Sequence, residues 1–327
     1  MSVLITGGTG GIGVGLAQEL LARGKDVVLF DIAPQSQRLT DIKDEVKIVQ
    51  GDLKVWPEML NAVRDNNVDE IFHHGGMLSI PSDLNPWAAF QVNIMGSMHV
   101  LEAARLFGVK KFIFASTDAT YGLGTGAVID DETLQRPITM YGAGKLYIEL
   151  LGRFYRRKFG LDFRSVRYCM VMRPGVKIRT LPVFMLWMVE NAALGEPFEC
   201  FAAENVVVPV LYYKDAVRAT MQLYEAPAEQ IKTVCYNLAG IKPTPTTGAL
   251  EKAIKKFIPD ARITYQPDPL VMEYYRTRPV STIDDACARQ EWGWKPEFTD
   301  IEKVVADFIE EVKTRGDFWG VGVDDRR

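Results

Sequence analysis

Tyr141 and Lys145 are spaced for proton transfer. They lie four positions apart, and a helix places two such residues on one face. A tyrosine with its ordinary pKa of about 10 is a poor base at neutral pH, but an ammonium group one turn away, together with the positive nicotinamide ring of a hydride acceptor, favours the phenolate. Thr117 follows an apolar run, and its hydroxyl could hold an alcohol or a carbonyl group against Tyr141. The three residues are therefore suited to moving a hydroxyl proton during a hydride transfer.

A glycine-rich stretch near the start of the sequence predicts a dinucleotide-binding loop. An apolar run over residues 3–5 precedes three glycines spaced three apart, and an amphipathic pattern follows. One glycine turns the chain, one admits a pyrophosphate and one allows close helix packing. The free N–H groups at the helix start would face the phosphate charge. The expected loop contacts are Gly7, Gly10, Gly11, Ile12 and Gly13.

Asp31 indicates which dinucleotide binds. It ends the apolar run 27–31, about one strand–helix–strand crossover after the first run. A carboxylate there can accept hydrogen bonds from both ribose hydroxyls of an adenosine and would repel a 2′-phosphate, so NAD is favoured over NADP. Other cofactor contacts are expected at or just beyond the ends of later strands. They are Asp52, Gly75, Gly76 and Tyr168, together with Tyr141 and Lys145.

The order of the elements predicts an α/β fold. Six apolar runs alternate with helical patterns over residues 1–171, which is typical of a doubly wound parallel Rossmann sheet. We expect an NAD-binding domain over 1–171, to which 210–240 return. Prolines interrupt the pattern from 172 to 209, so a smaller, mostly C-terminal substrate lobe is expected over 172–209 and 241–315. The last helix is expected to end near Lys313, and a mobile tail over 316–327, although Trp319 is able to dock.

Composition excludes several classes. The 327 residues are 47% hydrophobic, which suits one large domain or two closely joined lobes. The net charge is −4 with no basic run, and no apolar run is long enough to span a bilayer, so neither a nucleic acid nor a membrane is an expected partner. The first strand begins at once, so no signal peptide is expected. Four scattered cysteines and three histidines predict no metal site, no disulfide and a cytoplasmic location.

The sequence resembles the extended short-chain dehydrogenases/reductases, the NAD-dependent epimerase/dehydratase family, over nearly its whole length. The motifs are Thr6-Gly7-x-x-Gly10-x-x-Gly13, Asp31, Asp52-Leu53, Asn93, Ser116-Thr117 and Tyr141-Gly142-Ala143-Gly144-Lys145. Within that superfamily it is most similar to short-chain-type L-threonine 3-dehydrogenases. The resemblance implies that Leu53, Asn93 and Ser116 lie at the cofactor. It also implies a homodimer built on a four-helix bundle, which suits the helix 141–159 because its apolar residues cover more than one face.

The departures from that group concern the substrate. A Gly-Thr-Thr-Asp-like segment of the group is replaced by Thr180-Leu181-Pro182-Val183, and a tryptophan by Arg278. Arg173, Lys177 and Arg179 add positive charge to the same region, and arginine is suited to a carboxylate or a phosphate. The expected substrate contacts are Ser79, Thr117, Tyr141, Arg179 and Arg278.

Three functions remain open. The first is an NAD-dependent oxidoreductase that transfers hydride between NAD and a secondary alcohol of a small polar or anionic substrate, with a threonine-like 3-hydroxy acid as one candidate. The alternative is a nucleotide-sugar epimerase or dehydratase with tightly held NAD, which Arg278-Pro279 favours and the apolar segment 206–209 opposes. The third is a regulator that senses NAD without turnover. Such proteins tend to lose the tyrosine or the lysine, and both are present here.

Overall fold

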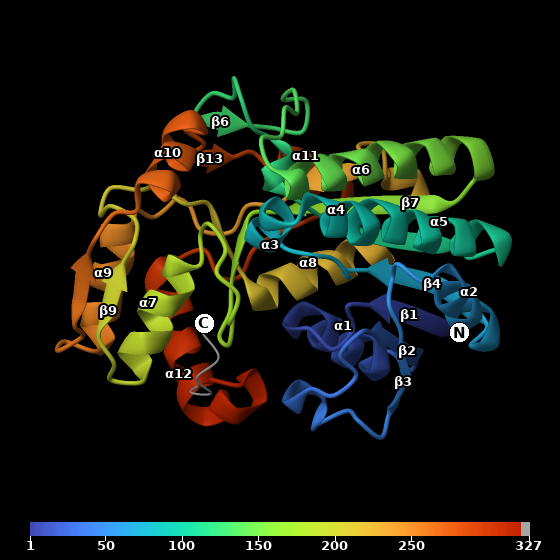
Figure 1. The fold of residues 1–327 in the computed structure, drawn as a ribbon, viewed down its shortest axis with the longest axis horizontal. Helices are drawn as coiled ribbons and strands as arrows, with labels where there is room; N and C mark the ends of the chain where they lie inside the picture. The colour runs from blue at the N-terminus through green and yellow to red at the C-terminus, as the bar shows by residue number, and fades with distance from the viewer. Residues whose placement is uncertain (322–327) are drawn as a thin grey trace.

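The computed structural model describes residues 1–321, in which seven parallel strands form the central sheet (Figure 1). Their order is β11-β7-β5-β4-β1-β2-β3, and every neighbouring pair is parallel. The strands are β1 (Ser2–Thr6), β2 (Asp26–Asp31), β3 (Val46–Gln50), β4 (Val68–His73), β5 (Lys111–Thr117), β7 (Asp162–Tyr168) and β11 (Cys235–Asn237). The predicted doubly wound parallel sheet is confirmed. Its order reverses between β1 and β4, where such sheets bind ligands.

Helices cover both faces of this sheet, which explains why its strands read as continuous apolar runs. On one face, Met59, Leu101 and Ile148 from three different helices pack on the strands. On the other face, Leu16 and Met221 do the same. The helices on the first of these faces are α2 (Trp56–Asp65), α5 (Ser97–Leu106) and α6 (Met140–Phe159). The helices on the second face are α1 (Gly11–Ala22) and α8 (Tyr213–Glu225).

The helical stretch around Asn93 is irregular. The chain passes through α3 (Ser79–Leu84) and α4 (Pro86–Ala89) into a π-helical segment, η2 (Phe90–Gly96), before α5 begins. Short π-helical segments are rare and occur often at functional sites. Asn93 lies in this segment, where its side chain contacts the loop that follows β4.

A second group of elements forms a smaller lobe beside the sheet (Figure 1). Its buried side chains, including Phe184, Leu250 and Phe308, form a hydrophobic core of their own. Its helices are α7 (Phe184–Ala193), α9 (Thr247–Phe257), α10 (Pro269–Thr277) and α12 (Ile301–Trp319), and its strands are β9 (Phe198–Cys200) and β12 (Ile263–Tyr265), which pair. This arrangement suits the predicted substrate lobe, whose domain boundaries remain a prediction.

Two further strand pairs lie outside the central sheet and the β9·β12 pair. β8 (Met170–Met172) pairs with β10 (Val210–Tyr212), and β6 (Val128–Ile129) pairs with β13 (Thr282–Ile283). The remaining helices are α11 (Ala286–Trp292) and the short 3₁₀ turns η1 (Gln37–Leu39), η3 (Asp118–Thr120) and η4 (Ala228–Gln230). Among the described residues, no helix has the length and apolar character needed to cross a bilayer.

The C-terminal helix is longer than expected. The sequence pattern predicts its end near Lys313, but α12 continues to Trp319, with a non-helical residue at Arg315. Trp319 is 1% exposed, and its indole Nε1 donates to Glu311 Oε2 at 2.9 Å. Burial of a large aromatic ring holds this last turn in place. Residues 316–319 are therefore not a mobile tail, and 322–327 lie outside the described residues.

Candidate active site

A cavity of about 790 Å³ lies at the carboxyl ends of the central strands, between the sheet and the second lobe. Cofactor and ligand pockets commonly enclose roughly 300–1,000 Å³. Most residues predicted for the site line this cavity, which brings together segments from the whole chain. They are Gly7, Gly10, Gly11, Ile12, Gly13, Asp31, Asp52, Leu53, Gly75, Gly76, Ser79, Ser116, Thr117, Tyr141, Lys145, Tyr168 and Arg278.

The glycine-rich loop forms one end of the cavity. The chain packs so closely there that residues larger than glycine would not fit at Gly7 and Gly13. Gly7 has a φ of +67°, and a Cβ atom on it would lie 2.8 Å from the backbone nitrogen of Gly75. A Cβ atom on Gly13 would lie 2.5 Å from the carbonyl oxygen of Gly7. The loop thus brings β1, α1 and the segment after β4 into close contact, and leaves the start of α1 open toward the cavity. This cradle fits the pyrophosphate of a dinucleotide.

Asp31 lies beside this loop at the end of β2. Its carboxylate accepts hydrogen bonds from the backbone nitrogens of Thr9 at 3.2 Å and Ala33 at 3.1 Å. These bonds hold the side chain at the cavity wall, where it can accept further hydrogen bonds from ribose hydroxyls. The geometry therefore suits the adenosine end of NAD.

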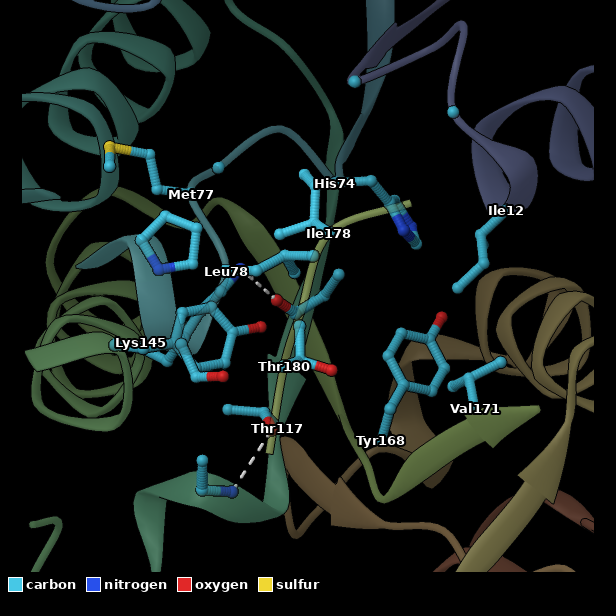
Figure 2. Close-up of a pocket in the computed structure, with 18 of the residues that line it drawn as sticks. Ile12, His74, Met77, Leu78, Thr117, Lys145, Tyr168, Val171, Ile178 and Thr180 are labelled. Atoms are coloured by element: carbon cyan, nitrogen blue, oxygen red, sulfur yellow. Dashed lines mark hydrogen bonds between the residues drawn. The ribbon is translucent and has the colours of Figure 1, made fainter. Parts of the chain in front are cut away.

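The proton-transfer residues come together on the opposite side of the cavity. Thr117 ends β5, and Tyr141 and Lys145 lie in the first turns of α6. Gly142 lets the start of α6 pack against the turn after β5, since a Cβ atom on it would lie 2.1 Å from the carbonyl oxygen of Ala119. Lys145 Nζ lies 5.7 Å from the centre of the Tyr141 ring. Figure 2 shows Thr117 and Lys145 on one side of the cavity, with Ile12 and Tyr168 across from them.

Burial governs the charge of both groups. It raises the pKa of Tyr141, and the Asp118 carboxylate raises it further, while the Thr117 hydroxyl acts in the opposite direction. Burial also lowers the pKa of Lys145 to about 8, against the effect of Glu149. Burial therefore opposes the phenolate in the protein alone, and the prediction that Lys145 and the positive nicotinamide together favour it stays a prediction. Removal from water is the largest effect on the pKa of both groups.

A buried ion pair behind Lys145 was missed from the sequence. Glu149 lies one further turn along α6 and accepts hydrogen bonds from Ser116 Oγ at 2.5 Å and Arg167 Nη2 at 2.7 Å. Lys145 Nζ donates to the carbonyl oxygen of Ala115 at 2.6 Å. These bonds join α6, β5 and β7, so they fix the lysine relative to the strand that carries Thr117. The spacing of four between Lys145 and Glu149 was the available signal.

Asn93 and Arg179 lie outside the cavity wall. Asn93 Oδ1 accepts from the backbone nitrogen of Met77 at 2.7 Å, and its Nδ2 donates to the Met77 carbonyl oxygen at 3.0 Å. Asn93 therefore positions the cofactor-side loop after β4. The Arg179 side chain is 51% exposed and bonds Asp268 at 2.9 Å. The prediction that Arg179 reaches the substrate is not met, because an acid distant in sequence holds its guanidinium at the surface.

Arg278 does reach the site, and its partner explains Asp118. Arg278 is 6% exposed, and its Nη2 donates to the Asp118 carbonyl oxygen at 2.8 Å and to the carboxylate at 2.9 Å. Arg278 Nε is buried and has no hydrogen-bond partner among the described residues. Asp118 follows Thr117 directly, so this pair places both signs of charge next to the proton-transfer residues.

His74 is a second residue that the sequence reading missed. It lines the cavity after β4, and its Nε2 is buried with no hydrogen-bond partner within residues 1–321. Burial, with a contribution from Lys145, lowers its pKa to about 3, so the ring is neutral at physiological pH. It lies 6.2 Å from the Tyr168 ring, whose hydroxyl bonds Thr220. Two histidines before Gly75-Gly76 were the available signal. Over the same residues, no group of three or more His, Cys, Asp and Glu could hold a metal ion.

Comparisons with known proteins agree with this geometry. The model of the NAD dependent epimerase/dehydratase family matches residues 3–239. The mitochondrial L-threonine 3-dehydrogenase of Bos taurus is 33% identical over 315 residues, covering 94% of this chain and 81% of the bovine protein. The structure of L-threonine dehydrogenase from Phytophthora infestans is 30% identical with a TM-score of 0.88, covering 96% of this chain and all of the other.

A monomeric L-threonine 3-dehydrogenase from a metagenome is also similar, with 26% identity and a TM-score of 0.87 over 96% of this chain and 99% of the other. The predicted family, the predicted cofactor NAD and the prediction of an NAD-dependent enzyme are confirmed. We conclude that this chain belongs to the NAD-dependent epimerase/dehydratase family.

Proposed function

We propose that the protein is an oxidoreductase that transfers hydride between NAD and a secondary alcohol of a small polar or anionic substrate. The observation that carries the proposal is the meeting of Thr117, Tyr141 and Lys145 at the wall of the cavity that the glycine-rich loop also lines. When bound, NAD supplies the hydride acceptor and a positively charged ring. A regulator without turnover would have no use for a buried tyrosine and lysine beside that ring.

Each of the three residues has a defined task. Thr117 is placed to hold the substrate hydroxyl, since its own hydroxyl lies at the end of β5 at the cavity wall. Tyr141 accepts the hydroxyl proton during oxidation and returns it during reduction. Lys145 is placed to hold the ribose next to the reacting ring, and its lowered pKa leaves it able to exchange a proton with Tyr141.

Arg278 and Asp118 favour a small substrate that carries charge. The buried Nε–H of Arg278 has no partner within residues 1–321, and it can donate to a substrate carboxylate. The Asp118 carboxylate beside it can accept from an ammonium group. Both signs together match an amino acid, and the bovine relative acts on L-threonine by name. A threonine-like 3-hydroxy acid is therefore the first candidate. Residues 180–182 at the cavity wall nevertheless differ from the polar Gly-Thr-Thr-Asp-like segment of the L-threonine 3-dehydrogenases.

NADH formation across a panel of alcohols tests the proposal. We expect formation of NADH with threonine or related 3-hydroxy acids, and less with small sugars. If none of them reduces NAD while a UDP-sugar is interconverted without added cofactor, the epimerase alternative is correct. That alternative draws on the family description and on Arg278, but Val208 and Pro209 line the cavity where a second phosphate-binding arginine would be needed.

We also propose a homodimer through the helices on one side of the sheet. Leu84 is 81% exposed, Trp87 66% and Leu150 59%, which is unusual for large apolar side chains on helices. They lie on α3, α4 and α6, and exposed Leu106 of α5 adds to them. The monomeric relative shows that a partner is not obligatory for the fold. Light scattering should give a dimer mass that Leu150→Glu reduces to monomer, whereas Leu270→Glu on α10, at a position that is 81% exposed, should leave it unchanged.

A cytoplasmic location is the remaining proposal. All four cysteines are free thiols, which is usual in a reducing compartment. The bovine relative is mitochondrial by name, so organelle and cytosol are the two outcomes to separate. Fractionation of the source cells, with detection of the native chain by antibody, should find it in the cytosolic fraction.

A further inference from the structure

The segment after β8 places an arginine against the glycine-rich loop. Arg173 is distant from this loop in sequence, yet a Cβ atom on Gly11 would lie 3.1 Å from its Cδ, Nε and Cζ atoms. Gly11 is the first residue of α1, where the free N–H groups of the helix face the cavity. Arg173 also lines the cavity. Its guanidinium therefore lies beside the cradle that fits a pyrophosphate.

Positive charge accumulates at this point. Arg173 Nη1 donates to the carbonyl oxygen of Pro174 at 3.0 Å. Arg38 lies nearby and donates to the backbone carbonyl oxygens of Gly175 at 3.4 Å and Trp319 at 3.1 Å, while its Nε is buried without a partner within residues 1–321. Burial and the charge of Arg38 lower the pKa of Arg173 to about 10, against the effect of Glu190. An anion bound here would relieve this repulsion.

We propose that Arg173 binds the pyrophosphate of NAD beside the start of α1, and so holds the segment 173–182 over the bound cofactor. The helix N–H groups and the guanidinium would then both donate to the phosphates, and the planar guanidinium is suited to bind a phosphate through two parallel hydrogen bonds. The inference rests on NAD as the cofactor. It concerns binding and does not depend on which alcohol is oxidised.

The same segment also lines the part of the cavity where we propose that the substrate binds, so the Arg173 contact would affect substrate binding. Ile178 and Thr180 line the cavity between His74 and Thr117, as Figure 2 shows. If Arg173 anchors the start of this segment on the cofactor, then binding of NAD positions the residues that face the substrate. Cofactor would bind before substrate, and the substrate KM would depend on Arg173 even though it lies at the phosphates.

A titration series with fragments of NAD tests the contact. The ligands are NAD, ADP-ribose and adenosine, followed by calorimetry with no alcohol present. Arg173→Ala should weaken NAD and ADP-ribose by about 10- to 100-fold, since a hydrogen-bonded charge is lost, and should leave adenosine within about twofold. Arg173→Lys should show a smaller loss, because it keeps the charge without the paired donors.

Arg179→Ala is the matched control from the same segment. Its guanidinium is paired with Asp268 at the surface, so NAD affinity should stay that of the wild type. NAD and ADP-ribose affinities unchanged in Arg173→Ala would overturn the proposal, as would an equal loss for adenosine, which would mean a general collapse of the cavity. If the wild type binds NAD but oxidises no alcohol, the proposed reaction fails while the Arg173 result still stands.

Discussion

The two walls of the cavity are built differently. The cofactor wall consists of the glycine-rich loop, the ends of β1, β2 and β5, and the first turns of α6, so main-chain geometry and the sheet determine its shape. The proposed substrate wall consists of the segment 173–182, which follows β8, and of residues around Arg278, which follows α10. Single side chains decide what it binds. The same NAD machinery can therefore serve different substrates when only the second wall changes, which is how one fold supports several reactions.

Removal of the Tyr141 hydroxyl should give the largest effect and test the chemistry of the first wall. We expect Tyr141→Phe to lower kcat by about 100- to 10,000-fold, because the proton acceptor is lost. NAD affinity, measured by calorimetry, should change little because the ring remains. Near-normal turnover would assign the proton transfer to another group.

Arg278→Ala should raise the substrate KM by about 10- to 100-fold and affect kcat less, because a charged hydrogen-bond donor at the second wall is lost. The NAD affinity should stay unchanged, which separates the two walls. Initial rates over a range of substrate concentrations give the split between KM and kcat. An unchanged KM would remove Arg278 from the substrate site.

His74 should make the cofactor wall sensitive to acid. Its folded-state pKa of about 3 lies below the ordinary 6.5, so the unfolded chain binds the proton first. Its contribution to stability is present above pH 6.5 and is lost as the pH falls toward 3. The loss from His74 by pH 4.5 should be about 2 to 3 kcal/mol. Urea unfolding at pH 7.5 and 4.5 should show a smaller loss in His74→Leu, and an equal loss in both proteins would contradict the assignment.

Asp118 links the two walls, and its removal should shift the pH profile. Its carboxylate raises the pKa of Tyr141, so Asp118→Asn should move the rise of kcat for alcohol oxidation to lower pH. The comparison is made at saturating substrate, since the change also frees Arg278. A profile that stays in place, or moves to higher pH, would show that Asp118 does not act on Tyr141.

Arg179→Ala should have the smallest effect, with kcat and KM within about twofold of the wild type, as is usual for an exposed ion pair. Its partner Asp268 holds it away from the cavity. A large rise in KM would show that Arg179 leaves Asp268 to reach the substrate, and the substrate wall would then have a second charged contact.

Most residues that line the cofactor wall were predicted from the sequence, and their contacts with NAD stay predictions. Gly7, Asp31 and Thr117 stand at strand ends, and parallel strands bring such ends to one edge of the sheet. Tyr141 and Lys145 were found by their spacing. Asn93 does not line the cavity, and its bonds to Met77 place it against the loop after β4, so its contact with the cofactor stays a prediction.

The substrate wall was predicted only in part, since partners distant in sequence decide which side chains enter it. Arg179 and Arg278 are alike as residues, but Asp268 holds the first at the surface and Asp118 holds the second inside. The end of α12 was also decided by tertiary contacts, because burial of Trp319 extends the helix past its expected end.

The sequence by itself determined the parallel sheet and NAD as the cofactor, and it predicted the NAD-binding loop and the proton-transfer residues, because these depend on local periodicity and short spacings. Only the tertiary structure decided the ionisation of Tyr141 and Lys145, the task of Asp118, the position of Arg173 against Gly11 and the exposure of the α3, α4 and α6 surface. Desolvation and charge pairing act between groups that only folding brings together, and no local pattern records them.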